Sequence, residues 1–315
     1  MTLRAIDDPL IVSTLSALPE DRVDSFVLAD GAYRGALLHG TRMINQMRAN
    51  HELGLIETLL LGHGYLAGGL LSTNVKGNDR ISFELSCDGP LGGLSVEATA
   101  AGTVRGYLKN NPIPLTDAPT SLDPAQFVGH GTLAVTKLLE RAKQPFTGHI
   151  RLVYGSLARD LAAYFVYSEQ TPTAFHVSIQ FDREGRPVGA GGLMIQAMPV
   201  LGGYEEREDA IQLIDAAVHE IGSIGRLFAD GATPAQILSD HFGALEPHPL
   251  ATKSVRFHCA CGRERFFNFI AALSIEELED IRRNGPFPLC TTCFNCNTTY
   301  SFSAEEIAQA YQLAR

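Results

Sequence analysis

The feature that most constrains this chain is a cluster of cysteines near its carboxyl end. Five of the six cysteines lie within the last 57 residues, as Cys259 and Cys261 in a Cys-Ala-Cys motif and as Cys290, Cys293 and Cys296 in Cys-Thr-Thr-Cys-Phe-Asn-Cys. Two close thiol groups about thirty residues apart are typical of a four-thiolate zinc site, because each group supplies two tetrahedral ligands from one turn of backbone. The same thiols can be oxidised, so the motif predicts either a structural staple or a redox sensor.

The size and composition indicate a soluble protein of the cytoplasm. The chain has 315 residues, of which 45% are apolar and 19% charged, enough for two domains and a large core. No run of eighteen apolar residues occurs, and the first ten residues lack the apolar stretch of a signal peptide, so we expect no membrane partner. Thiols stay reduced in the cytoplasm, and clustered cysteines there indicate metal or redox chemistry.

The charge distribution argues against a nucleic-acid partner. The net charge is −10, with 18 basic and 28 acidic side chains in residues 1–250 and seven of each sign in residues 251–315. The acidic bulk repels nucleic acid, and the cysteine segment is not a basic patch. Four metal-bound thiolates would make that segment more negative still.

Residues 1–200 are predicted to form one α+β core domain with a mostly antiparallel sheet. A buried helix interrupted by glycines is expected at 53–71. Strands and helices alternate without the regular repeat of a parallel fold. The expected strands are 80–86, 93–99, 132–136, 149–154 and 175–181, and a further helix is expected at 156–170.

The remaining residues are predicted to form a linker and a small domain. Gly202-Gly203 marks a boundary, and residues 201–255 favour a marginally stable helical linker with helices at 206–229 and 233–242. An ordinary helical connection is the alternative for this stretch. Residues 256–315 are predicted to form a zinc-binding domain whose helices begin at Ser274 and Ser303, each followed by a glutamate at the third position of a capping box.

Five thiols compete for four ligand positions. A zinc knuckle turns sharply after its second cysteine, and the next residue often needs a left-handed backbone, which glycine and asparagine tolerate better than phenylalanine. A glycine follows Cys261 and an asparagine follows Cys296, whereas a phenylalanine follows Cys293. The pair Cys293 and Cys296 is therefore favoured, and Cys290 becomes a spare thiol, either buried or a substitute ligand.

A redox switch is favoured over a permanent staple by the Cys-x-Cys pair. Two cysteines one residue apart close only a small, strained ring when oxidised, whereas metal keeps both as reactive thiolates. A strong oxidant such as hypochlorite or peroxide converts thiolates to sulfenates and disulfides and releases the zinc. A domain of about sixty residues that depends on zinc for folding then unfolds.

Several longer segments resemble one protein family. The tail contains FHCACGRERFFNFIAAL and CFNCNTTYSF, and the amino-terminal part contains DGAYRGALLHGT, LLSTNVKGNDRISFELSCDGPLGGLSVEA, GTVRGYL, GHGTLAVTK, SLARDLAAYFVYSEQTPTA and AGGLMIQAMP. With these segments the chain resembles the heat-shock protein 33 family, the redox-regulated holdase chaperones, almost from end to end. In that resemblance the position of the Tyr-Ser-Phe run at 300–302 also indicates Cys293 and Cys296 as the second pair of metal ligands.

The resemblance implies a latent monomer in which one Zn²⁺ is held by Cys259, Cys261, Cys293 and Cys296. It implies that oxidation pairs Cys259 with Cys261 and Cys293 with Cys296, that zinc leaves, and that the zinc domain and the linker unfold. The active form, often a homodimer, is then expected to hold unfolding client proteins without ATP. Cys290 departs from the four-cysteine pattern and offers a competing partner for Cys293.

Two other functions stay open at this point. One is a constitutive, zinc-stapled interaction module, and the other is a thiol-disulfide enzyme. Four thiolates leave no open position for water, and the sequence has neither a nucleophile elbow nor a P-loop, so we expect no enzyme. The glycine motifs at 62–69 and 189–192 are interpreted as tight packing or turns.

Overall fold

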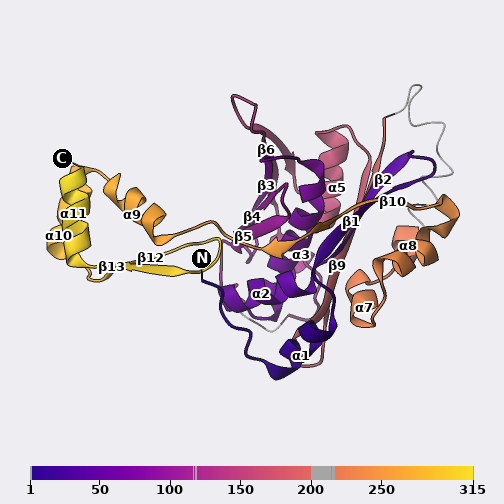
Figure 1. The fold of residues 1–315 in the computed structure, drawn as a ribbon, viewed down its shortest axis with the longest axis horizontal. Helices are drawn as coiled ribbons and strands as arrows, with labels where there is room; N and C mark the ends of the chain where they lie inside the picture. Colours follow the sequence, from indigo (N-terminus) through magenta and orange to yellow (C-terminus); the bar gives the residue numbers. More distant parts are fainter. Residues whose placement is uncertain (1, 116, 118, 200–213, 215–216, 315) are drawn as a thin grey trace.

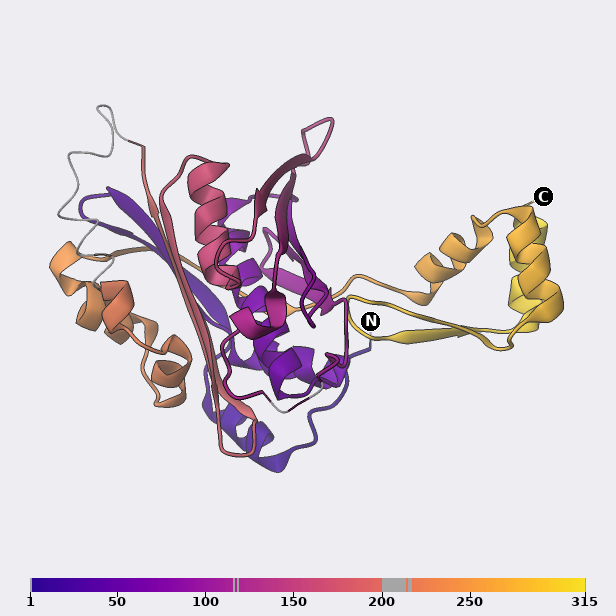
Figure 2. The same cartoon turned by 180° about the vertical axis from the view of Figure 1, so that it is seen from behind.

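The computed structural model describes residues 2–115, 117, 119–199, 214 and 217–314. Two β-sheets with a helix layer between them form the body, and a narrow carboxyl-terminal extension projects from one end of it (Figures 1 and 2). A two-stranded hairpin lies in the extension. The predicted α+β architecture with mainly antiparallel pairing is confirmed.

The first sheet has five antiparallel strands in the order β10-β1-β2-β9-β8. Its central strands pair in an unbroken register from Tyr33 opposite Ala197 to His39 opposite Gly191. The expected strand at 175–181 is part of this sheet, whereas β1, β2 and β10 were not predicted. The strands are β1 (Arg22–Leu28), β2 (Tyr33–His39), β8 (Thr173–Phe181), β9 (Pro187–Ala197) and β10 (His248–Ser254).

The second sheet has six strands in the order β11-β5-β4-β3-β6-β7, and only the β11–β5 pair is parallel. Buried side chains alternate with more exposed ones along β4 and β5, because successive residues point to opposite faces. The predicted strands at 80–86, 93–99 and 132–136 are confirmed. The strand predicted at 149–154 is shifted toward the amino terminus and is observed as β7. The strands are β3 (Arg80–Cys87), β4 (Gly93–Thr99), β5 (Thr103–Leu108), β6 (Gly131–Leu138), β7 (Phe146–Arg151) and β11 (Arg256–Phe257).

Helix α3 (Leu55–Leu71) lies between the two sheets and is continuous, so the predicted interruption by glycines is wrong. The glycines serve packing instead: a Cβ atom on Gly68 would lie 2.9 Å from Cγ1 of Val96 in β4. The stretch Leu55–Asn74 is long and apolar enough to cross a membrane, but most of it is buried inside the protein, as for a core helix. The other helical elements of the body are α1 (Pro9–Ala17), α2 (Thr41–His51), η1 (Ser72–Asn74), α4 (Ala125–Val128) and α5 (Leu157–Tyr167).

Helices α7 (Ile224–Ala229) and α8 (Pro234–Phe242) cover the face of the first sheet that points away from α3 (Figures 1 and 2). The helix predicted at 233–242 is confirmed, with a capping box at Thr233. The prediction of a single helix over 206–229 is wrong for the described residues, because the chain turns at Gly222, with φ +62°, before α7 begins. Residues 206–213 lie outside the described residues.

The segment between α8 and the extension is not purely helical. After η3 (Gly243–Leu245) the chain forms β10, which pairs with β1 at the edge of the first sheet. Its side chains are almost all exposed, so β10 lacks the apolar alternation from which a strand is predicted.

The extension has a small core of its own, formed by Ile270, Leu278, Phe302, Ile307 and Ala310. Both predicted capping boxes, at Ser274 and Ser303, are present. The elements are α9 (Arg263–Ala271), α10 (Ile275–Asn284), β12 (Leu289–Thr292), β13 (Thr299–Phe302) and α11 (Ala304–Leu313).

Candidate metal centre

Four cysteines meet at the junction of the body and the extension. The Sγ atoms of Cys259, Cys261, Cys293 and Cys296 all lie within 4.8 Å of one another, and the four side chains are buried. Cys259 and Cys293 are 3.8 Å apart at Sγ, and Cys261 and Cys296 are 3.3 Å apart. These cysteines belong to the same apolar cluster as α3 and the second sheet, so the site is packed against the body.

The second sheet of the body positions the first cysteine pair. Strand β11 runs parallel to β5 with Phe257 opposite Val104, and the next amide, of His258, donates to the Val104 carbonyl at 3.0 Å. The Phe257 ring stacks on Tyr65 of α3, with ring centroids 6.0 Å apart. Cys259 therefore leaves the edge of the sheet at a fixed point.

The second pair lies in the loop between β12 and β13. The amides of Cys296 and Asn297 both donate to the Cys293 carbonyl, at 3.2 and 2.7 Å. Asn297 has φ +56°, the left-handed backbone that the sequence predicts after Cys296. The same expectation after Cys261 is wrong, because Gly262 is extended, with φ −158°, and begins α9 as its N-cap residue.

This loop is anchored to the carboxyl end of α2. The Asn50 side chain donates to the Cys296 carbonyl at 3.2 Å, and the Asn297 side chain donates to the Asn50 carbonyl at 3.1 Å. Phe294 is 74% exposed, but its ring lies 5.5 Å from that of Tyr107 in β5. Sequence reasoning did not find Asn50 or Tyr107, since neither carries a metal-site motif.

Three of the sulfurs have a polar side chain beside them. Arg105 donates to Cys259 Sγ at 3.6 Å, the Tyr300 hydroxyl lies 3.1 Å from Cys261 Sγ, and the Thr298 hydroxyl lies 3.3 Å from Cys296 Sγ. Such partners orient metal ligands and tune their reactivity.

The cluster favours one thiolate and resists further ones. Hydrogen bonds from Cys293 and then Cys296 lower the pKa of Cys259. Hydrogen bonding with Cys259 raises the pKa of Cys293, and it raises the pKa of Cys296 to about 11, because each would add a second negative charge to a buried site. A bound dication offsets this repulsion, so the four soft donors fit a metal ion such as Zn²⁺.

Cys290 lies outside the group of four. Its side chain is exposed, on β12 opposite Ser301, with Sγ 3.5 Å from the Ser301 hydroxyl. The expectation of a buried thiol is therefore wrong.

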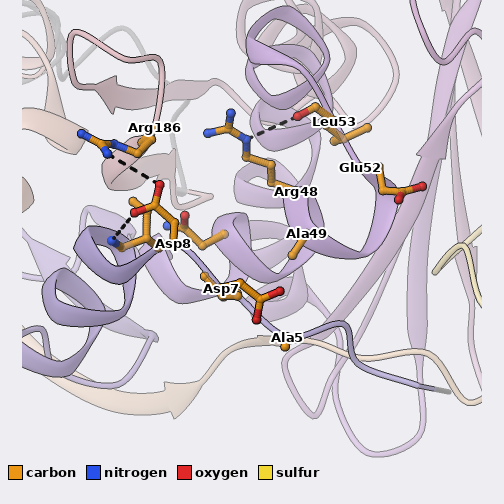
Figure 3. Close-up of a pocket in the computed structure, with 11 residues that line it drawn as sticks. Ala5, Asp7, Asp8, Arg48, Ala49, Glu52, Leu53 and Arg186 are labelled. Atoms are coloured by element: carbon orange, nitrogen blue, oxygen red, sulfur yellow. Dashed lines mark hydrogen bonds and ion pairs between the residues drawn. The ribbon is translucent and has the colours of Figure 1, made fainter.

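A cavity of about 280 Å³ beside α1 and α2 contains none of the cysteines (Figure 3). In its wall Arg186 pairs with Asp8 at 3.6 Å, and Arg48 donates to the Leu53 carbonyl at 3.3 Å. The cavity therefore adds no group to the metal centre.

Comparison with known proteins gives the family. The model of the family described as Hsp33 protein matches residues 21–303. The chain belongs to the Hsp33 family. It is 31% identical over 290 residues to the 33 kDa chaperonin of Desulforamulus reducens, covering 91% of this chain and 96% of that protein. It is 32% identical over 281 residues to the 33 kDa chaperonin of Bacillus subtilis, covering 88% and 94%.

The fold is shared with a solved Hsp33 structure. The crystal structure of the 33 kDa chaperonin (heat shock protein 33 homolog) of Thermotoga maritima matches with a TM-score of 0.81 and 28% identity, covering 93% of this chain and 98% of that one. The resemblance seen in the sequence is thus confirmed, and the protein is a chaperone of the Hsp33 family.

Proposed function

We propose that the protein is a redox-regulated, ATP-independent holdase of the cytoplasm, and that the four-cysteine cluster is its switch. The observation that carries this proposal is the place of the cluster: four buried sulfurs lie at the junction between the body and the extension and within the main apolar core. A change at the sulfurs then acts on both the body and the extension.

We propose that the chain is organised as a core domain (1–200), a linker (201–255) and a zinc-binding domain (256–315).

The latent form holds one Zn²⁺ through Cys259, Cys261, Cys293 and Cys296. In the part of the chain that the structure describes, four buried thiols form the donor set, which suits zinc better than harder cations. When bound, zinc keeps the sulfurs as thiolates and ties the extension to the body.

Oxidation closes the pairs Cys259–Cys261 and Cys293–Cys296. In each pair two thiolates lose two electrons and form one S–S bond, and one molecule of peroxide takes up these electrons with two protons to give two molecules of water. Sulfurs joined in this way are no longer thiolate ligands, so the extension loses the interaction that holds it.

Loosening at the cluster reaches the linker through the chain itself. Strand β11 is separated from Cys259 by one residue and is joined to β10 through Val255, whose amide donates to the Asp21 carbonyl at 3.1 Å. Helices α7 and α8 follow one another on the first sheet and are six and nine residues long, so they depend on packing for stability.

Release of the linker uncovers an apolar face for clients. Seven buried residues of the inner strands β1, β2 and β9 pack against the linker helices, and unfolding proteins expose apolar segments that bind such a face. We propose this face as the client-binding surface, used by an oxidised homodimer. The seven residues are Phe26, Leu28, Tyr33, Leu37, Leu193, Ile195 and Ala197.

One assay tests the proposal against its alternatives. Zinc-loaded protein is treated with hypochlorite, or with peroxide at heat-shock temperature, while zinc release and the aggregation of a denatured client are followed. Protection that appears only with zinc loss supports the switch. Equal protection before and after oxidation favours a constitutive interaction module, and no protection in either state contradicts a holdase.

A further inference from the structure

The cysteine cluster has a charged partner in the body. Arg105, in β5, donates from Nη1 to Cys259 Sγ at 3.6 Å across 154 positions of sequence. Thr298 and Tyr300, which also lie beside sulfurs of the cluster, are uncharged and belong to the extension. The arginine therefore joins the second sheet of the body to the cluster by a charge-assisted hydrogen bond.

A second residue holds Arg105 in place. Glu97 in β4 is the direct cross-strand partner of Arg105, and its Oε1 accepts from Nε at 3.0 Å and lies 2.8 Å from Nη2. The guanidinium thus uses one side for the carboxylate and another for the sulfur. Its five donors in a rigid fork permit this, whereas a lysine provides only a single point of charge.

The end of β11 brings the sulfur close to this guanidinium. Phe257 pairs with Val104 in parallel register, and the amide of His258 donates to the Val104 carbonyl. Arg105 follows Val104 in β5, and Cys259 follows His258 just beyond the end of β11, where its Sγ accepts from Arg105.

Arg105 also lines a hollow of the surface that Cys259 does not reach. A surface cavity of about 100 Å³ is lined by Arg105, Arg80, Arg265, His258 and Glu97, among others, but not by Cys259. The Cys259 side chain is only 1% exposed. A small oxidant in this cavity therefore meets the guanidinium before it meets the sulfur.

A thiolate that donates electron density to a cation is a weaker nucleophile. A metal ion already keeps Cys259 deprotonated, so the guanidinium does not act by changing its protonation. It donates a hydrogen bond to a lone pair of the Cys259 sulfur, and it holds the Cys259 side chain in one orientation, as hydrogen-bond partners of metal ligands do. Both effects slow the attack of the sulfur on an electrophile.

We propose that Arg105, fixed by Glu97, is a positioning residue that lowers the reactivity of the Cys259 thiolate and so raises the oxidant level at which the switch responds. The regulatory consequence rests on the proposed redox function, whereas the difference in sulfur reactivity does not.

The test compares Arg105→Gln with Arg80→Gln. Arg80 lines the same cavity, and its Nη1 lies 3.9 Å from Oε1 of Glu97, whereas Nη1 of Arg105 donates to Cys259 Sγ. Each zinc-loaded protein is treated with iodoacetamide at saturating zinc, and the alkylation rate of every cysteine is followed by mass spectrometry. Zinc release under peroxide is measured in parallel with a metal-sensitive dye.

We expect Arg105→Gln to alkylate faster at Cys259, by about tenfold, the scale on which second partners affect metal sites. Cys293 should keep its rate, Arg80→Gln should match the original protein, and Arg105→Lys should restore part of the protection. Glu97→Gln should give a smaller change in the same direction.

An unchanged rate at Cys259 overturns the proposal. A rise at all four cysteines together also overturns it, because that result indicates loss of docking and not an effect on one sulfur. If client protection proves independent of oxidation, the proposed function fails while the alkylation result stands, so the two failures are distinguishable.

Discussion

The imidazole of His39 in β2 packs against the ring of Phe228 in α7, with ring centroids 4.5 Å apart. His39 is 2% exposed, and its Nε2 lies 3.1 Å from the Thr41 hydroxyl. Its Nδ1 has no hydrogen-bond partner among the described residues and lies 3.9 Å from Asp21. The linker therefore covers a titratable side chain that it must uncover when it leaves.

Acid should weaken linker docking. Burial, with the charges of Arg42 and Arg22, lowers the pKa of His39 to about 4, whereas an exposed histidine titrates near 6.5. Burial raises the pKa of Asp21 to about 7, so at pH 5 this carboxyl is mostly protonated and gives a charged His39 little support. The undocked state binds the His39 proton more tightly, so the contribution of His39 to docking is fully present well above pH 6.5 and falls by roughly 1–2 kcal/mol by pH 5.

Limited proteolysis between pH 7.5 and 5 measures this loss. Cleavage in α7 and α8 of the zinc-loaded protein should accelerate as the pH falls, and His39→Gln, which carries no charge at either pH, should remove most of the acceleration. His248→Gln is the matched control, because His248 is exposed on β10. Equal acid sensitivity in the protein with and without His39 would contradict the mechanism.

A glycine contact holds α7 on the first sheet. A Cβ atom on Gly189 in β9 would lie 2.1 Å from the Gly225 carbonyl oxygen and 2.8 Å from Ala229 Cβ. Gly189→Ala should therefore push α7 off the sheet, at a cost of about 1–3 kcal/mol. We expect client protection without oxidant and with zinc retained.

The control for this prediction lies in the same linker. Gly243 has nothing within 4 Å of the position of a Cβ atom, and its backbone is helical, so Gly243→Ala should leave the latent state intact. Zinc content and aggregation of a denatured client are measured for both variants. A latent Gly189→Ala protein would show that α7 does not guard the client surface.

The anchor at Asn50 should set how easily the extension loosens. Asn50→Ala removes the donor of the buried Cys296 carbonyl, and an unsatisfied buried acceptor costs about 1–3 kcal/mol. We expect faster zinc release on mild heating with peroxide, followed with a metal-sensitive dye. Asn74→Ala, on η1 in the body, should release zinc at the original rate.

The parts of the molecule that were predictable are those with local patterns. The cysteine motifs single out the four sulfurs that lie together in the structure, strand β3 alternates in burial, and the glycines at 189–192 pack tightly as interpreted. Strand β10 has no apolar alternation, and its pairing with β1 depends on the sheet already being present. The contact of Arg105 with Cys259 joins residues 154 positions apart, and no spacing rule in one sequence predicts such a pair.

The ligand set is tested by serine substitutions at two neighbouring cysteines. Cys293 is buried 3.8 Å from Cys259 Sγ, whereas the exposed Cys290 lies outside the group of four. Cys293→Ser should therefore lose tight zinc binding, by at least tenfold in affinity, and Cys290→Ser should keep one zinc per chain. Zinc content after dialysis against a chelator measures both. Loss of metal from Cys290→Ser would mean that the spare thiol replaces one of the four in solution, and it would then make Cys290–Cys293 the competing disulfide on oxidation.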